Sequence, residues 1–80
     1  MQVIRAIVLV TVESGSEKEI IRTLRNIPSV KQAYEIYGGY DIIAMVEADT
    51  FENIKRTVSY TIRNIANIRN TLTMIVVDKA

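Results

Sequence analysis

The sequence predicts an α+β sandwich in which a four-stranded antiparallel sheet carries two helices on one face. The apolar patterns read in order as strand, helix, strand, strand, helix, strand. The chain also aligns with itself at a shift of 38 positions, where "TLRNIPSVKQAYEI" lies over "TIRNIANIRNTLTM". Because β-α-β crossovers are right-handed, two copies of such a unit interleave into a single sheet of this kind. The fold prediction therefore rests on both the order of elements and the internal repeat.

The first half of the chain contains a strand, a helix and a second strand. Residues 2–12 include apolar residues at both odd and even positions, which predicts a strand covered on both faces. Ser16 and Glu19 have capping-box spacing, and Pro28 ends the helix that follows. The buried stripe of this helix is predicted to be Ile20, Ile21, Leu24 and Ile27. Residues 30–37 alternate, which predicts a strand with one side formed by Val30, Gln32, Tyr34 and Ile36.

The second half repeats this order. Gly38 and Gly39 have the spacing of a two-residue hairpin, and residues 40–48 form a strand that is apolar on both parities in its middle. Asp49 or Thr50 caps a second helix. Its buried stripe is predicted to be Phe51, Ile54, Val58, Ile62 and Ile65. A final strand at residues 70–77 completes a ferredoxin-like βαββαβ sandwich.

Composition narrows the class of protein. Eighty residues form a single domain, residues 1–80, with no room for a second one. The chain has no cysteine or histidine, so we expect no disulfide, no transition-metal site and no cofactor. Ten basic against nine acidic residues provide no basic surplus for direct binding of nucleic acid. The longest apolar run, residues 6–10, is too short to span a membrane, and no secretory signal precedes it, so a cytoplasmic protein is expected.

An apolar sheet face predicts self-association. Two helices cover only one face of a four-stranded sheet, yet the first and third strands are apolar on both. A core of this size rarely supplies more than about 3 to 5 kcal/mol, so a partner chain is expected to add stability. The sequence therefore predicts a homodimer that packs sheet on sheet, a dimeric α/β barrel, which assembles further into a ring.

The stretch "YGGYDI" at residues 37–42 is the main candidate site. Gly38 and Gly39 lack Cβ atoms, so a ligand carboxylate can approach their backbone N–H groups. Asp41 offers a negative charge for an ammonium group, and the pair suits a zwitterion. The alternative is purely structural: a tight turn, with an aspartate that binds the turn backbone. Arg25 and Arg63 are expected near helix C-termini on solvated surfaces, with no role in a site.

Several motifs in this order resemble those of a known family. They are "NIPSV", "YGGYDIIAMVEA", "NIANIRNT" and "TLTMIVV". Over essentially all 80 residues the chain resembles the effector-binding (RAM) domain of the leucine-responsive/asparagine-responsive (Lrp/AsnC) transcriptional regulators. The resemblance implies dimers, larger rings and an amino-acid effector held where dimers meet. It implies ligand-binding residues at Gly38, Gly39, Tyr40, Asp41, Thr71 and Thr73.

Full-length members of that family carry a helix-turn-helix domain that binds DNA. The sequence has no recognition-helix pattern, so it resembles a stand-alone form without a DNA-binding domain. We therefore expect a transcription-regulating module that acts through its oligomeric state or by co-assembly with full-length regulators. The sequence does not identify the effector.

Other functions remain as alternatives. Small monooxygenases share the dimeric fold, but the absence of histidine and cysteine argues against an enzyme. An RNA-recognition sheet needs aromatic residues on its two central strands, and the first strand has none. A related amino-acid-binding module of metabolic enzymes would use a glycine after the first strand, and Gly15 leaves that open. A ligand-free oligomerisation adaptor differs only in lacking the effector.

Overall fold

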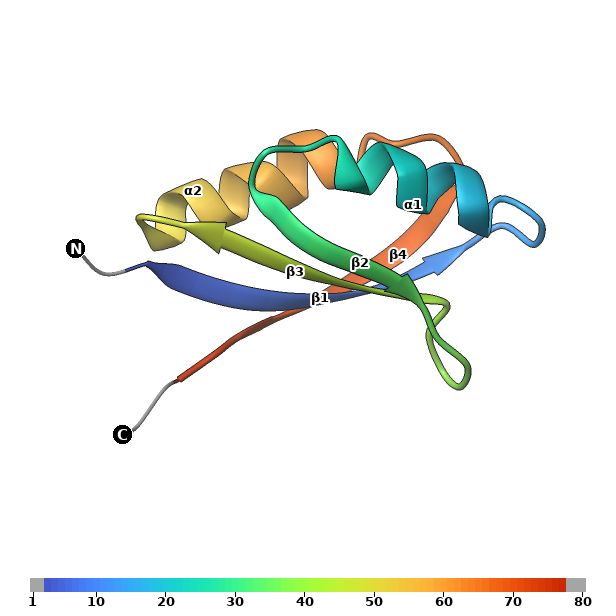
Figure 1. Ribbon diagram of the computed structural model, residues 1–80, viewed down its shortest axis with the longest axis horizontal. Helices are drawn as coiled ribbons and strands as arrows, with labels where there is room; N and C mark the ends of the chain where they lie inside the picture. Colours follow the sequence, from blue (N-terminus) through green and yellow to red (C-terminus); the bar gives the residue numbers. More distant parts are fainter. Residues whose placement is uncertain (1–2, 78–80) are drawn as a thin grey trace.

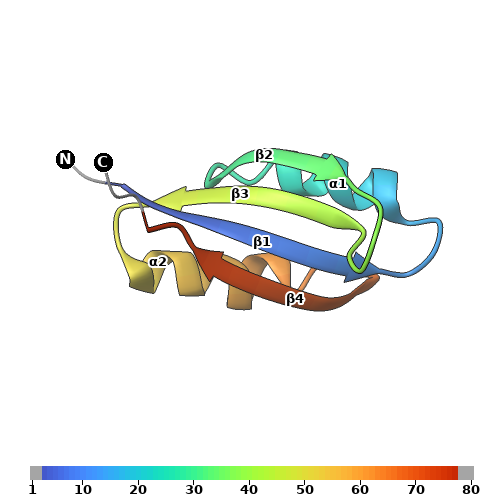
Figure 2. The ribbon, with the colours of Figure 1, turned by 90° about the horizontal axis from the view of Figure 1, so that it is seen from below.

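A computed structural model describes residues 3–77, so residue 2 of the predicted first strand lies outside the described part. The elements are β1 (Ile4–Val12), α1 (Glu17–Arg25), β2 (Val30–Glu35), β3 (Ile42–Ala48), α2 (Phe51–Arg56), the π-helix η1 (Thr57–Ile62) and β4 (Ile68–Ile75). The strands form one antiparallel sheet in the order β2-β3-β1-β4, with the helices on one face (Figures 1 and 2). The predicted ferredoxin-like fold is confirmed. No helix in residues 3–77 is long and apolar enough to cross a membrane.

The pairing of the two central strands fits the internal repeat. Ile7 on β1 faces Met45 on β3, and these two positions are themselves 38 apart. On either side of this pair, Ala6 faces Val46 and Val8 faces Ala44. In the repeat, Val46 is equivalent to Val8 and Ala44 to Ala6. The two pairs are therefore related by a pseudo-two-fold axis through the Ile7–Met45 pair. The axis relates β1 to β3, whereas the outer strands differ in register: Ala33 on β2 faces Ala44, but its repeat position, Thr71 on β4, faces Val10.

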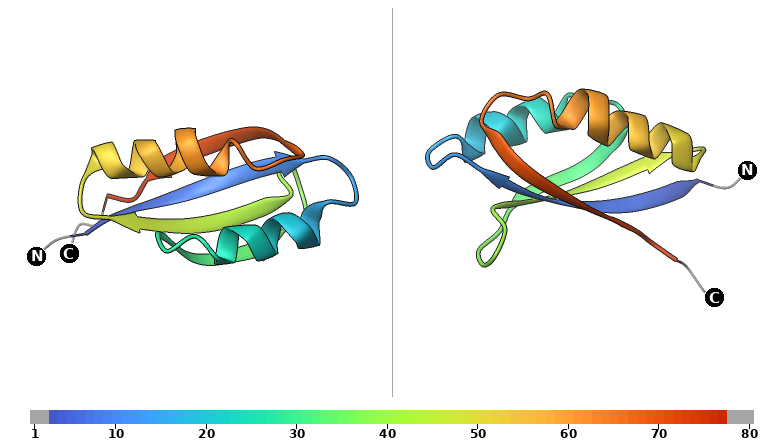
Figure 3. Two further views of the ribbon diagram at one scale, coloured as in Figure 1. Left: turned by 90° about the horizontal axis from the view of Figure 1, so that it is seen from above. Right: turned by 180° about the vertical axis from the view of Figure 1, so that it is seen from behind.

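The hydrophobic core lies between the sheet and the helices. Even-numbered side chains of β1 and β3 point to the helix side, because successive side chains of a strand alternate between faces, and all of them are buried except Ile4 and Ala48, which are partly buried. The helices cover them from above (Figure 3). The largest fully buried side chains are Ile20, Leu24, Ile42, Ile54, Ile62, Val8, Val10 and Val46.

The opposite face of the sheet carries no helix (Figure 1). The strand register places apolar side chains from all four strands on this face, in two rows centred on β1. We call this surface the open face; its apolar residues are Ile7, Leu9, Tyr34, Ile43, Met45, Leu72 and Met74. Leu72 and Met74 are 44% and 42% exposed. The prediction that the central strands are apolar on both faces is confirmed.

The predicted strict alternation of the second strand is wrong. A register shift between Val30 and Gln32 interrupts the pairing of β2 with β3. Because a bulge adds one unpaired residue, Val30 and Ala33 both reach the buried side. Tyr34 lies on the open face opposite Ile43, so Val30 and Tyr34 do not share a side.

The predicted capping box on the first helix is also wrong. Ser16 occupies the N-cap position, but its hydroxyl donates a hydrogen bond to the Glu13 carbonyl oxygen and caps no backbone N–H. Glu17 instead accepts a hydrogen bond from the Gly15 N–H. The second helix has the predicted type of cap, since the Thr50 hydroxyl accepts a hydrogen bond from the Asn53 N–H at 3.1 Å.

Several further positions differ from the predicted pattern. α1 ends at Arg25, so Ile27 lies beyond it and is only partly buried. Phe51 is exposed, because it begins α2 at the end of the sheet, where the helix does not yet lie over the core. The last strand begins at Ile68, two residues earlier than predicted.

Candidate functional site

The candidate site centres on the loop that joins β2 to β3. β2 ends at Glu35 and β3 begins at Ile42, so the two glycines lie in a six-residue loop, residues 36–41, and the predicted two-residue hairpin is wrong. The Ile36 N–H closes the loop by donating to the Asp41 carbonyl oxygen at 2.9 Å. The loop projects to the side of the sheet away from the helices (Figure 1). Tyr37 at its tip is fully exposed, and Tyr40 is partly buried.

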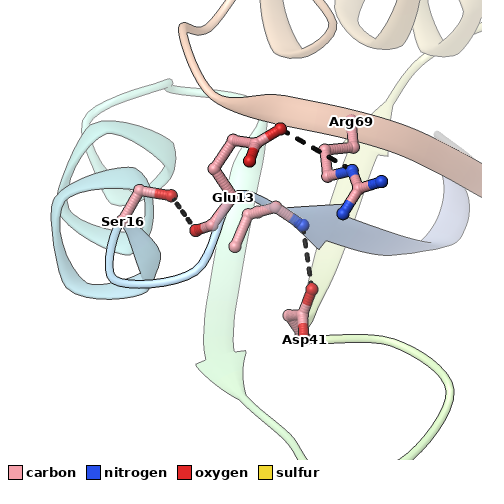
Figure 4. Close-up of polar contacts among 5 residues, drawn as sticks. Glu13, Ser16, Asp41 and Arg69 are labelled. Atoms are coloured by element: carbon pink, nitrogen blue, oxygen red, sulfur yellow. Dashed lines mark hydrogen bonds and ion pairs between the residues drawn. The ribbon is translucent and has the colours of Figure 1, made fainter.

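Asp41 attaches the loop to the end of β1. Its backbone N–H donates to the Val10 carbonyl oxygen at 2.9 Å. Its carboxylate oxygen Oδ2 accepts a hydrogen bond from the Val12 N–H at 2.8 Å (Figure 4). This N–H lies beside a register shift between Thr11 and Val12 in the β1–β4 pairing. The Asp41 carboxylate therefore binds the backbone of β1 and not the turn backbone that the structural alternative expected, and this bond holds a half-buried carboxylate in a defined position.

The two glycines differ in what their backbone requires. Gly38 has φ +130°, a conformation that side chains with a Cβ rarely adopt, so the turn itself needs glycine there. Gly39 has no positive φ, and a Cβ built on it would meet nothing within 4 Å. Within residues 3–77, no acceptor binds the N–H groups of residues 37–40. The loop therefore presents adjacent unused donors beside a fixed carboxylate, an arrangement suited to an anion next to a cation.

An exposed ion pair, Glu13 with Arg69, is drawn together with Asp41 in Figure 4. Arg69 Nε lies 3.7 Å from Glu13 Oε2, and both side chains are more than half exposed (Figure 4). An exposed pair of this kind contributes little to stability. No group of three or more aspartates or glutamates in the described part of the chain is placed to hold a metal ion.

Thr71 and Thr73 lie on the other side of the sheet from the loop. They face Val10 and Val8 on β1, whose side chains are buried beneath the helices. Both threonines line a groove of about 410 Å³ between β4 and the second helical segment. We call it the β4 groove; its residues are Phe51, Ile54, Lys55, Val58, Ser59, Arg63, Thr71, Thr73 and Ile75.

The structure thus separates the predicted site residues into two groups. Gly38, Gly39, Tyr40 and Asp41 share the β2–β3 loop. Thr71 and Thr73 are together in the β4 groove, and the sheet stands between the two groups. Within one chain they do not form a single pocket.

Comparison with known proteins decides which family this geometry belongs to. The model of the "Lrp/AsnC ligand binding domain" matches residues 5–80. The chain belongs to the Lrp/AsnC ligand-binding-domain family. The resemblance inferred from the motifs is thereby confirmed. A search of curated proteins finds no match.

Solved structures agree with the Lrp/AsnC assignment. The crystal structure of FFRP-DM1 has a TM-score of 0.89 at 36% identity, over 92% of this chain and 99% of that one. Hypothetical protein PHS023 from Pyrococcus horikoshii gives 0.87 at 36% identity, over 95% and 92%. The transcriptional regulator NMB0573 from Neisseria meningitidis, solved as a complex with L-Met, shares the fold at 14% identity and TM-score 0.84. The match covers 95% of the Lrp/AsnC domain described here and 51% of that regulator, so the domain spans about half of the regulator's length.

Sequence reasoning missed two cations of the β4 groove in this Lrp/AsnC domain. Lys55 and Arg63 both line the groove, although Arg63 was assigned to a solvated helix end. The repeat makes position 63 equivalent to position 25, so the sequence offers no signal that separates the two arginines, and only their surroundings in the structure do. The spacing of apolar residues indicates only that both arginines lie near the end of a helix.

Proposed function

We propose that this chain is a regulatory module that binds an amino-acid effector in sites completed between copies of the domain. The observation that carries the proposal is the β2–β3 loop, in which unused backbone donors lie beside the anchored carboxylate of Asp41. Membership of a ligand-binding family supports it. The L-Met complex of NMB0573 supports an amino acid as the class of effector.

The loop recognises the part common to all amino acids. The effector carboxylate accepts hydrogen bonds from N–H groups around Gly38 and Gly39, where no side chain blocks its approach. The effector ammonium group lies against the Asp41 carboxylate, which already accepts one hydrogen bond from Val12 and has capacity for more. A zwitterion satisfies both groups at once.

A second copy completes the site. The loop and the β4 groove lie on opposite sides of the sheet, so both reach one effector only when they come from different chains. The open face supplies the first association, a homodimer packed sheet on sheet, because its apolar residues are otherwise left in water. Further contacts between dimers, arranged in a ring, then bring a loop to a neighbouring groove.

A thermal-shift screen of the twenty amino acids tests the proposal. A true effector at a hundredfold excess over Kd stabilises the folded state by about 2.7 kcal/mol. Asp41→Asn preserves an acceptor for the Val12 N–H but removes the charge, so it should abolish the shift while leaving the apoprotein folded. Gly39→Val blocks the loop without a clash inside the chain and should have the same effect.

The outcomes separate the proposal from its alternative. If the shift survives both Asp41→Asn and Gly39→Val, the loop is not the effector site. If none of the twenty amino acids produces a shift while the sheet dimer is present, the chain is a ligand-free oligomerisation adaptor.

The open face also provides a route to regulation. Longer Lrp/AsnC regulators contain a domain of the same fold, so we propose that this chain co-assembles with them through its open face. Mixing the protein with a full-length homologue from the same cell, followed by native mass spectrometry, should reveal mixed oligomers. Only homo-oligomers after prolonged mixing would contradict co-assembly.

A further inference from the structure

The β4 groove has a counterpart on the other half of the sheet. A groove of about 550 Å³, here called the β2 groove, lies between α1 and β2 and includes Lys18, Arg22, Arg25, Tyr34 and Glu35. The internal repeat relates the two grooves: positions 25 and 63 are equivalent, as are 33 and 71, and 35 and 73. The two grooves can therefore be compared in the charged and polar groups that line them.

The arginine of the β2 groove is occupied by its own chain. Arg25 donates to the Ala33 carbonyl oxygen from Nε at 3.1 Å and from Nη2 at 2.7 Å. Its guanidinium carbon also lies 5.8 Å from the centre of the Tyr34 ring. Glu35 adds a negative charge to the same groove. Arg25 is therefore satisfied within its own chain, although Lys18 and Arg22 of this groove form no ion pair or side-chain hydrogen bond within residues 3–77.

The arginine of the β4 groove has no such partner. Within residues 3–77, neither Arg63 nor Lys55 forms an ion pair or a side-chain hydrogen bond. In the sequence repeat Thr71 and Thr73 align with Ala33 and Glu35, although β4 pairs four residues out of step with β2. The β4 groove consequently combines two uncompensated cations with hydroxyl donors and contains no carboxylate.

The β4 groove has an apolar floor. Ile54 and Val58 are buried beneath it, and Phe51 and Ile75 flank its end. A ligand in the groove therefore contacts an apolar floor together with the charged and hydroxyl groups of Lys55, Arg63 and Thr73. A short aliphatic chain that ends in a carboxylate matches this lining, because a guanidinium binds carboxylates through several parallel N–H donors.

From this geometry we infer that the β4 groove selects an effector with an acidic side chain, of the glutamate or aspartate class, and that Arg63 is the specificity-determining residue. The inference rests on the proposed function, in which the β2–β3 loop of a neighbouring chain holds the α-carboxylate and α-ammonium groups. The side chain then points into the β4 groove. Lys55 adds to the attraction, and Thr71 and Thr73 donate hydrogen bonds to the side-chain carboxylate.

Isothermal titration with glutamate, glutamine and leucine tests this selectivity. Glutamate should bind at least about tenfold more tightly than glutamine, since the two differ only in the charge that Arg63 recognises. Arg63→Gln should reduce this ratio to near one. Arg56→Gln removes the same charge from α2 outside the β4 groove and should leave the ratio unchanged.

Glutarate separates a failure of this inference from a failure of the proposed function. Glutarate has both carboxylates of glutamate but no ammonium group, so it reports on the groove without Asp41. It should shift the NMR signal of Arg63 Nε–H and leave that of Arg25 unmoved, because Arg25 is already bound to Ala33.

Each outcome has one reading. If amino acids bind in a manner that depends on Asp41, but glutamine or leucine binds as tightly as glutamate, the acidic selectivity is wrong and the proposed function stands. If glutarate shifts Arg63 while no amino acid binds, the anion groove is real and the amino-acid function is wrong. If neither binds, both are overturned.

Discussion

The Asp41 carboxylate accepts a hydrogen bond from the Val12 N–H at 2.8 Å, and this bond joins the β2–β3 loop to the end of β1. Asp41→Ala should lower the free energy of unfolding by about 1 to 3 kcal/mol, because a partly buried donor loses its charged acceptor. Asp41→Asn keeps an oxygen acceptor and should cost less. Urea denaturation at a fixed protein concentration measures both.

A matched control for Asp41 lies at the opposite end of β3. Asp49 is exposed and accepts only from the Asn53 side chain at 2.8 Å, so Asp49→Ala should change stability by no more than about 0.5 kcal/mol. Equal losses for Asp41→Ala and Asp49→Ala would show that the Val12 bond has no special role.

The two loop glycines should respond differently to alanine. Gly38→Ala forces a Cβ onto a backbone with φ +130° and should destabilise the fold by about 1 to 3 kcal/mol. Gly39→Ala meets no strain and no contact within 4 Å, so the apoprotein should stay within about 1 kcal/mol of the original, on the stable side. Thermal denaturation without ligand gives both values, and the reverse order would refute the assigned loop geometry.

The open face should be sensitive to charge. Leu9→Glu places a carboxylate at the centre of the apolar rows, and should weaken the proposed sheet-on-sheet dimer by at least about a hundredfold because a buried unpaired charge costs several kcal/mol. Sedimentation velocity should then show monomers at low micromolar concentration.

Tyr60→Glu serves as the control for this variant, since Tyr60 is 72% exposed on η1, on the other side of the molecule. It should leave the dimer intact. A well-folded monomer of the unmodified protein at low micromolar concentration would remove the sheet dimer and the inter-chain site together.

The two N-cap positions provide a test of local structure. Thr50→Ala should cost about 1 kcal/mol, because the Asn53 N–H loses its acceptor at the start of α2. Ser16→Ala should cost less, since the Ser16 hydroxyl caps no N–H and the Glu13 carbonyl still accepts from the Ser16 N–H at 3.1 Å. Urea midpoints of the two variants give the comparison, and a larger loss for Ser16→Ala would contradict the observed cap geometry.

Element order, sheet composition and family could all be inferred from the sequence. Valine and isoleucine at both odd and even positions of the first and third strands indicated apolar residues on both faces, and the structure places these strands at the centre of the sheet. The repeat at 38 positions requires the pseudo-symmetry that the Ile7–Met45 pair shows. The motif order in "YGGYDIIAMVEA" and its neighbours was specific enough to identify the Lrp/AsnC family.

Only the tertiary structure decided the register and the partners of polar groups. The bulge between Val30 and Gln32 and the six-residue loop depend on which atoms of neighbouring strands meet, and this information is absent from periodicity. Ser16 has the spacing of a capping box, but its hydroxyl found a closer acceptor in Glu13. Arg25 and Arg63 look alike in sequence but have different surroundings in the structure. Arg25 donates to the Ala33 carbonyl oxygen, whereas Arg63 lines a groove that also contains threonine hydroxyls.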